Sequence, residues 1–108
     1  VKRAWNDGGS WQMGTAALDL NPSAAGRTSI SVTDDGRVHV AYRAGEPEGL
    51  ALASGTAGGS GYTWDVRTVH AGDDIGGFAS MTLGPAGRLH FAYQDRAAEA
   101  VLYTTVSP

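Results

Sequence analysis

The chain has no cysteine, and this absence excludes disulfide bonds and thiolate metal sites. No apolar run approaches the roughly 20 residues of a membrane-spanning helix, so nothing in the sequence indicates a membrane as a partner. An excess of positive charge is also missing. The formal net charge is −3 with both signs scattered, which gives no electrostatic reason to expect a nucleic acid partner. No stretch shows convincing helical periodicity.

The chain begins at Val1 rather than methionine and shows no signal peptide, so we expect a piece processed or excised from a longer protein. A secreted or cell-surface location is favoured. The length of 108 residues fits one domain covering residues 1–108. Folding of so short a chain buries only roughly two thirds of its unfolded surface. Its Gly and Ala content, with Arg preferred over Lys, is typical of high-GC bacterial proteins, and no cofactor is predicted.

What the chain does contain is an internal repeat. The segment Ser29 to Tyr42 returns 51 residues later as Ser80 to Tyr93, with six of 14 positions identical and four more exchanging one apolar residue for another. The identical pairs are Ser29/Ser80, Gly36/Gly87, Arg37/Arg88, His39/His90, Ala41/Ala92 and Tyr42/Tyr93. A period of this length is typical of repeat architectures, in which each unit buries a face against the next.

Short segments with a period of two follow one another along the chain, as where Ile30 and Val32 alternate with Ser29 and Ser31. Turn signals separate them, including Asp34-Asp35-Gly36 and a long Gly/Ser turn at Gly55 to Gly61. Nine strands are predicted, at residues 1–5, 11–17, 27–33, 37–43, 50–54, 63–70, 78–83, 88–94 and 101–106. The fold class is therefore all-β.

Within one repeat the strands can be named A, B, C and D, with A starting near Ser29. The chain then reads C-D, A-B-C-D, A-B-C, which is two four-stranded units in permuted order plus an extra C strand. The repeat units cover about 1–49 and 50–100, and the extra strand is 101–106. Four-stranded sheets repeated at this spacing predict β-propeller blades. Two blade equivalents are too few to close a ring, so we expect oligomerisation or attachment to a larger chain.

The two C–D turns share a second signal. Residues 4–11 and 57–64 both place Gly, then Ser or Thr, then Trp at the same spacing. This pattern resembles the Asp-box, Ser-x-Asp-x-Gly-x-Thr-Trp, of sialidase-like (BNR-repeat) propellers, a family that places the box between the third and fourth strands of a blade. Alanine replaces the serine in both copies, and Asn6 and Gly59 replace the aspartate. The resemblance implies a propeller fold; the residues themselves indicate a structural clasp in which Trp anchors the turn.

His39 and His90 occupy the same place in both repeats. Because a catalytic residue is needed once per site, a histidine that recurs in each unit is better explained by packing between sheets. Residues that do not repeat are better functional candidates. In a propeller the D–A and B–C loops share one face, and the candidate ligand-binding residues on it are Arg27, Arg43, Asp73, Asp74, Phe78, Gln94, Asp95 and Arg96, with Glu46, Glu48 and Glu99 beside them.

Carboxylates, guanidiniums and one aromatic ring on this face suit a polar ligand such as a sugar, whose hydroxyl groups need donors and acceptors. A solvated charged rim is the alternative. Enzyme activity is not favoured. Sialidase-like chemistry asks for three arginines, of which Arg27 alone is suitably placed, and the family's Arg-Ile-Pro motif is absent. The adjacent Asp73 and Asp74 would point opposite ways on an extended chain, unlike a glycosidase carboxylate pair.

The sequence therefore predicts a non-catalytic, ligand-binding β-propeller module that binds carbohydrate, as small lectins that it resembles do. Such lectins can assemble two-blade chains as trimers into six-bladed rings, so a homo-oligomer is the expected partner. Two alternatives stay open. The chain is a fragment of a larger secreted sialidase-like propeller or glycosidase, or it is a structural or protein-interaction repeat without a small ligand.

Overall fold

The computed structural model describes residues 2–6, 8, 11–15, 28–45, 47–58 and 61–107. These residues form nine strands and a single 3₁₀ turn, and the all-β prediction is confirmed. The strands are β1 (Lys2–Asn6), β2 (Trp11–Thr15), β3 (Ser29–Val32), β4 (Val38–Gly45), β5 (Glu48–Gly58), β6 (Gly61–Ala71), β7 (Ile75–Leu83), β8 (Leu89–Asp95) and β9 (Ala100–Val106).

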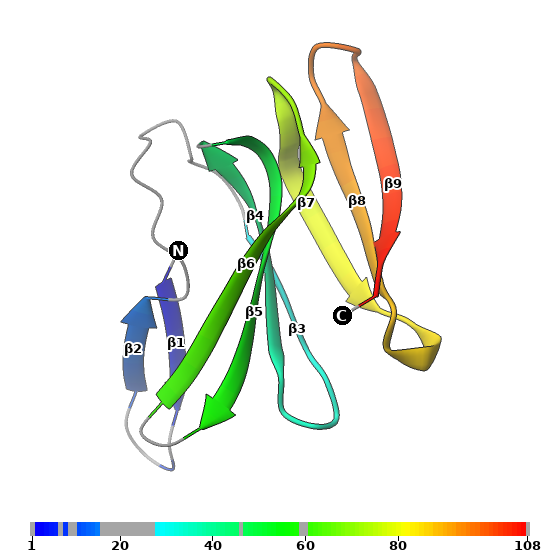
Figure 1. Cartoon of the computed structure of the whole chain (residues 1–108). Helices are drawn as coiled ribbons and strands as arrows, with labels where there is room; N and C mark the ends of the chain where they lie inside the picture. The colour runs from blue at the N-terminus through cyan, green and yellow to red at the C-terminus, as the bar shows by residue number, and fades with distance from the viewer. Residues whose placement is uncertain are drawn as a thin grey trace.

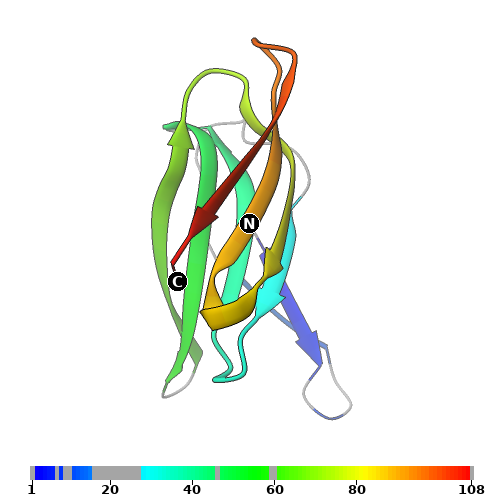
Figure 2. The same ribbon diagram turned by 90° about the vertical axis from the view of Figure 1, so that its right-hand side faces the viewer.

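Hydrogen bonding groups the strands into three antiparallel sheets in chain order: a β1–β2 hairpin, a four-stranded sheet β3–β4–β5–β6 and a three-stranded sheet β7–β8–β9. Figure 1 shows the hairpin on one side of the four-stranded sheet and the three-stranded sheet on the other. Figure 2, turned by 90°, looks onto the three-stranded sheet with the four-stranded sheet behind it. No sheet formed by the described residues closes on itself, so a propeller ring stays a prediction.

The expected long turn at 55–61 is wrong, because β5 continues to Gly58 and β6 begins at Gly61. Packing explains the extension. A Cβ on Gly55 would stand 2.8 Å from the Trp64 ring, which therefore lies directly over the glycine backbone. Tyr62 stacks on the same ring with centroids 5.9 Å apart. Gly55 thus makes room for the Trp64 ring inside the strand instead of ending it.

The two repeats share one pairing register. Ile30 pairs with Val40 in the first repeat, and their equivalents Met81 and Phe91 pair in the second. The β4–β5 and β8–β9 pairs also share one register, since Ala41 pairs with Leu52 and Ala92 pairs with Tyr103. An offset of 51 residues therefore identifies positions with the same place in each sheet.

The main core lies between the four- and three-stranded sheets. Ala41, Leu50 and Leu52 contribute from one side, and the other side consists of Ile75, Ala79, Met81, Leu89, Phe91 and Tyr93. The Ser29 hydroxyl joins the sheets by accepting a hydrogen bond from the Met81 amide at 3.0 Å. A smaller buried cluster lies on the opposite face of the four-stranded sheet and contains Val38, Val40, Tyr42, Ala44, Ala51 and Ala53.

His39 lies fully buried on the face of β4 that meets the three-stranded sheet, as the packing interpretation predicts. For His90 that interpretation does not hold in this structure, because His90 is half-buried with its Nδ1 2.7 Å from the hydroxyl of the exposed Tyr103. The Nδ1 of His39 is 2.9 Å from the Ser54 hydroxyl oxygen, and its Nε2 is buried without a hydrogen-bond partner among the described residues. Burial, and then the positive charge of Arg37, lowers the pKa of His39 below 6.5. The neutral imidazole is thus the form that the core accepts.

Acidification should therefore weaken the fold through His39. Because the folded-state pKa lies below the unfolded value of about 6.5, the unfolded chain binds more protons between these two values. The contribution of His39 is complete above pH 6.5 and is lost as the pH falls toward the folded-state pKa. Urea unfolding from pH 7.5 to pH 5 measures the loss in the free energy of unfolding. His39→Asn, which keeps a neutral partner for Ser54, should show a smaller loss; an equal loss in both proteins contradicts the prediction.

Candidate functional site

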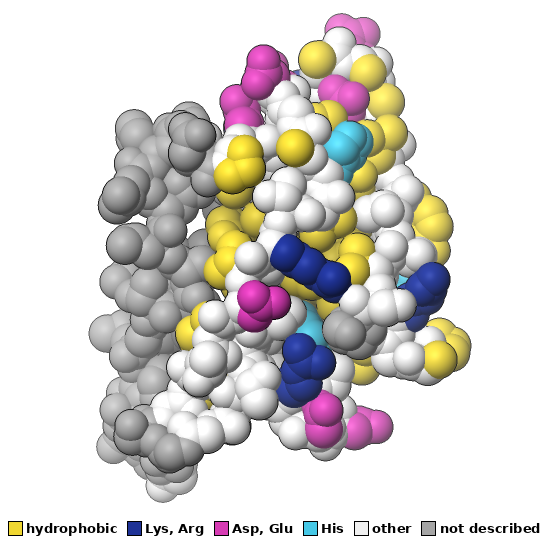
Figure 3. All heavy atoms as spheres, viewed as in Figure 1, with side chains coloured by type: hydrophobic (Ala, Val, Ile, Leu, Met, Phe, Trp, Pro, Cys, Tyr) yellow, Lys and Arg dark blue, Asp and Glu magenta, His cyan; other side chains and the backbone are white. Residues whose placement is uncertain are grey.

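Three loops meet at one end of the molecule, between β4 and β5, between β6 and β7, and between β8 and β9. The Gly72 amide donates to the Glu48 carbonyl at 2.9 Å, and the Arg96 amide donates to the Asp74 carbonyl at 3.1 Å. We call this end the rim. These are the B–C and D–A loops that the sequence places on one face. Figure 3 shows Asp and Glu side chains gathered at this end.

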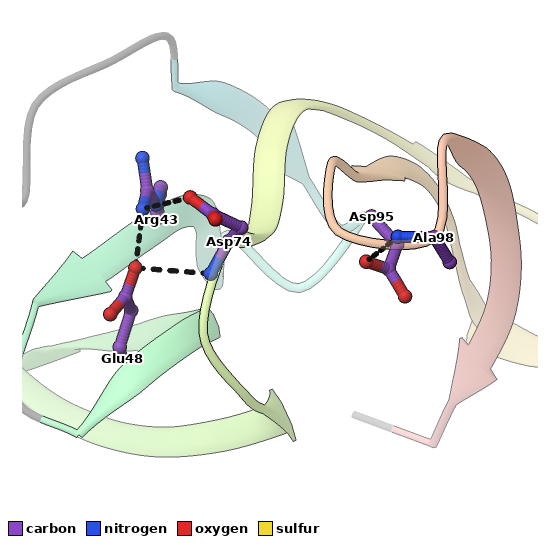
Figure 4. Close-up of polar contacts among 5 residues, drawn as sticks. All are labelled: Arg43, Glu48, Asp74, Asp95 and Ala98. Atoms are coloured by element: carbon purple, nitrogen blue, oxygen red, sulfur yellow. Dashed lines mark hydrogen bonds and ion pairs between the residues drawn. The ribbon is translucent and has the colours of Figure 1, made fainter.

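Arg43, near the end of β4, holds two of the loops together. Its guanidinium forms an ion pair with Glu48 and lies 3.6 Å from Asp74 Oδ1 (Figure 4). The same Glu48 carboxylate accepts the Asp74 amide hydrogen at 3.1 Å. That amide, and then Arg43, lowers the pKa of Glu48 below 4.5. Arg43 and Asp74 are thus brought together in a clamp in which one guanidinium is shared by two carboxylates, those of Glu48 and Asp74.

The Phe78 ring has a different environment. The register of the β7–β8 pair shifts between Gly77 and Ser80, and Phe78 lies in this irregularity with φ of 51°. A non-glycine residue in this left-handed region is strained, and such bulges redirect a side chain. The Phe78 side chain is 66% exposed. The backbone of β7 therefore stores strain to present an aromatic ring at the surface.

Two hollows adjoin at this point. The first, of about 240 Å³, is lined by Phe78, Ser80, Ala92, Tyr93, Gln94 and Val101. The second, of about 370 Å³, is lined by Gln94, Arg96, Glu99, Ala100 and Val101. Gln94 and Val101 belong to both, so an apolar surface passes directly into a charged one. We call this pair the rim hollow.

Gln94 links the two parts of the rim hollow. Its Oε1 is buried and makes no hydrogen bond with the described residues. Beneath it Tyr93 is fixed by a 2.8 Å contact between its hydroxyl and Nδ1 of His70. Burial, and then the nearby Asp95 carboxylate, raises the pKa of Tyr93 above 10. An unpartnered buried acceptor costs free energy, so a ligand hydroxyl that reached Gln94 would relieve this cost.

The remaining candidates are separated from the hollow or differently engaged. Asp95 accepts the Ala98 amide hydrogen at 3.1 Å and so stabilises its own loop (Figure 4). Asp73 is exposed in the β6–β7 loop. Arg27 lies outside the described residues.

Sequence reasoning placed Glu48 and Glu99 on the rim without choosing them as binding residues. It missed Val101, which forms part of both hollows. The repeat alone could not have identified Val101, because its equivalent Leu50 is apolar as well; the structure distinguishes them, with Leu50 fully buried and Val101 80% exposed.

Among the described residues, no cluster of His, Asp and Glu has the composition of a metal site. The same part of the chain contains no helix long and apolar enough to cross a membrane. Comparison with protein-family models, with curated proteins and with solved structures finds no match to this chain. The fold and the rim thus define the protein only as an all-β stack of antiparallel sheets with a hollow at one end that is partly apolar and partly charged.

Proposed function

We propose that this chain is a non-catalytic ligand-binding module of the β-propeller type, and that the rim hollow binds a carbohydrate. The observation that carries the proposal is the strained Phe78 beside Gln94, Arg96 and Glu99. Sugars bind where an aromatic ring meets their apolar face and amide, guanidinium and carboxylate groups meet their hydroxyls. The rim hollow combines these groups within a few residues of two neighbouring loops.

Propeller architecture is part of the same proposal. Its support is the 51-residue repeat, the shared register and the resemblance of the C–D turns to the Asp-box. Three copies of a two-blade chain would supply six blades, and the repeated sites would act together with higher avidity than one site alone. A role as a segment of a larger secreted sialidase-like propeller or glycosidase is the second candidate, and a purely structural or protein-interaction repeat is the third.

The carboxylates do not favour an enzyme. Glu48 is engaged by Arg43 and by the Asp74 amide, and Asp95 is engaged by its own loop. A glycosidase needs one carboxyl group held protonated and a second one placed across the bond to be cleaved. The rim instead lowers the pKa of Glu48, which suits charge neutralisation and not proton donation.

Removal of the Phe78 ring tests the site. A glycan array with the full chain identifies ligands, and calorimetry then measures the dissociation constant of the strongest one. We expect Phe78→Ala to weaken binding about tenfold, which corresponds to about 1.4 kcal/mol and to the usual value of an aromatic contact. Val66→Ala, an exposed apolar residue on β6, is the matched control and should bind as the unmodified chain does. An array without any glycan signal rules out the carbohydrate proposal.

A further inference from the structure

The repeat allows equivalent positions of the two larger sheets to be compared, and their exposed fractions differ. Leu50 and Leu52 are 0% exposed, because the three-stranded sheet covers them. Their equivalents 51 residues later are Val101, 80% exposed, and Tyr103, 68% exposed. In the first repeat these positions are core; in the second they face solvent.

We define the outer face as the surface of the three-stranded sheet that points away from the four-stranded sheet. It consists of Ser80, Thr82, His90, Ala92, Val101 and Tyr103. Hydrophobic side chains reach the surface on the side of β8 and β9 in Figure 3. Their equivalents in the four-stranded sheet all lie against the three-stranded sheet. Within the chain, the face equivalent to the outer face is therefore covered by a sheet of the same repeat.

We propose that the outer face binds the four-stranded sheet of a second copy of this chain, head to tail. The face of that sheet that would bind is the one that carries Ile30 and Val32. The inference rests on the propeller part of the proposed function and not on the carbohydrate. It extends an interface that already exists once within the chain. A sheet of the same repeat has apolar side chains at the required spacing, and a second copy provides one.

The internal interface also predicts which residues meet. Met81 and Leu83 of β7 pack toward the four-stranded sheet, and their equivalents on β3 are Ile30 and Val32. Those two side chains are 60% and 56% exposed. Ile30 and Val32 of the second copy would therefore pack on the outer face, as Met81 and Leu83 pack toward the four-stranded sheet within the chain.

The outer face has a recess where the first of these side chains would fit. A hollow of about 180 Å³ is lined by Ser80, Met81, Thr82, His90, Phe91, Ala92 and Tyr103. At the equivalent place inside the chain, the Ser29 hydroxyl binds the main chain of Met81. Ser80 is exposed and has the same position in its sheet. We expect it to bind the main chain of Ile30 in the second copy.

The free edge of β9 fits the same partner. In the four-stranded sheet β5 pairs with β6, but no described strand pairs with the outer edge of the equivalent strand β9. The missing strand is a D strand, and β2 is one by sequence. Figure 1 places the β1–β2 hairpin on the side of the four-stranded sheet that would dock. The same side carries the buried cluster of Val38, Val40, Tyr42, Ala44, Ala51 and Ala53, so docking requires the hairpin of the second copy to move and this cluster to be uncovered. The edge of β9 then offers β2 a new pairing.

A contact of this kind uses different surfaces on the two copies and therefore repeats from copy to copy, and it ends in a ring when the rotation between copies closes. Three strands about 4.8 Å apart and about seven residues long cover on the order of 350 Å². A standard interface covers roughly 800 Å² per partner. A single contact is accordingly weak, and sedimentation measurements should extend to about 1 mM chain.

Two charge variants give the test. Tyr103→Lys changes the outer face, Ile30→Lys changes the β3 side, and both side chains are exposed, so both variants should fold. Each variant alone should remain monomeric at concentrations where the unmodified chain forms trimers. When mixed in equal amounts, they should form dimers and nothing larger, because only the outer face of one and the β3 side of the other remain intact. Ala97→Lys, in the exposed β8–β9 loop, should assemble as the unmodified chain does.

The unmodified chain staying monomeric up to about 1 mM overturns the proposal and points to a sheet from outside this chain. The proposal is also overturned if only one of the two variants disturbs assembly, because that result indicates a symmetric contact between identical surfaces. Glycan binding is measured separately on monomeric Ile30→Lys, whose rim hollow is intact. Assembly without glycan binding removes the carbohydrate proposal and leaves the docking one standing; binding without assembly does the reverse.

Discussion

Leu50→Ala should lower the free energy of unfolding by about 2–5 kcal/mol, as large-to-small substitutions in well-packed cores do. Leu50 is 0% exposed and belongs to the cluster between the two larger sheets. Its side chain packs in a cluster that includes Ile75, Ala79 and Met81 of β7. Neighbouring strands are fixed by hydrogen bonds, so they cannot collapse fully into the cavity. Urea unfolding of the monomeric chain measures the loss.

The matched control is Val101→Ala, at the equivalent position of the second repeat. Val101 pairs with Gln94 as Leu50 pairs with Arg43, but its side chain is 80% exposed. Its truncation should cost under about 1 kcal/mol, the range of strand propensity alone. If Leu50→Ala leaves too little folded protein to measure, Leu50→Val removes one methylene group and should cost about 0.8 kcal/mol. Equal losses at positions 50 and 101 would contradict the assignment of inner and outer faces.

The strands were predictable from the sequence because their alternation and their repeat agree. Ile30 and Val32 alternate with serines, and the same register returns at Met81 and Leu83. The 51-residue offset carries the information that one strand alone lacks, namely which residues occupy the same place in different sheets.

Strand ends were less predictable, because tertiary packing decides them. Gly55 looks like a turn residue in the sequence, yet the Trp64 ring requires glycine there inside a strand.

The sequence predicts which loops form the candidate site but not how their side chains are arranged. Loop order places Arg43, Asp74 and Arg96 at one end, and the structure agrees. Loop order in the sequence cannot show that Arg43 is engaged by Glu48 and Asp74, since that depends on side-chain distances. Nor can it give the left-handed φ of Phe78, which arises from the register shift between β7 and β8.

Gly76→Ala should be among the most destabilising single changes in the chain. Gly76 has φ of 94°, and a Cβ there would stand 2.8 Å from the Leu50 nitrogen and 2.9 Å from its Cα. Both contacts are with backbone, which cannot turn aside as a long side chain does. The substitution therefore combines a left-handed conformation, which costs an alanine about 1–2 kcal/mol, with overpacking between sheets, which costs typically about 1–3 kcal/mol.

Gly36→Ala separates these two costs. Gly36 lies in the β3–β4 turn with φ of 84°, and a Cβ there would meet nothing within 4 Å. It should therefore show only the conformational cost of about 1–2 kcal/mol, while Gly76→Ala shows the sum of about 2–5 kcal/mol. The difference in the free energy of unfolding between the two variants measures how closely β7 must approach β5. A difference near zero would mean that the two sheets can separate by a Cβ without loss. The contact between the sheets, which is the basis of the docking proposal, would then be too loose to specify a partner.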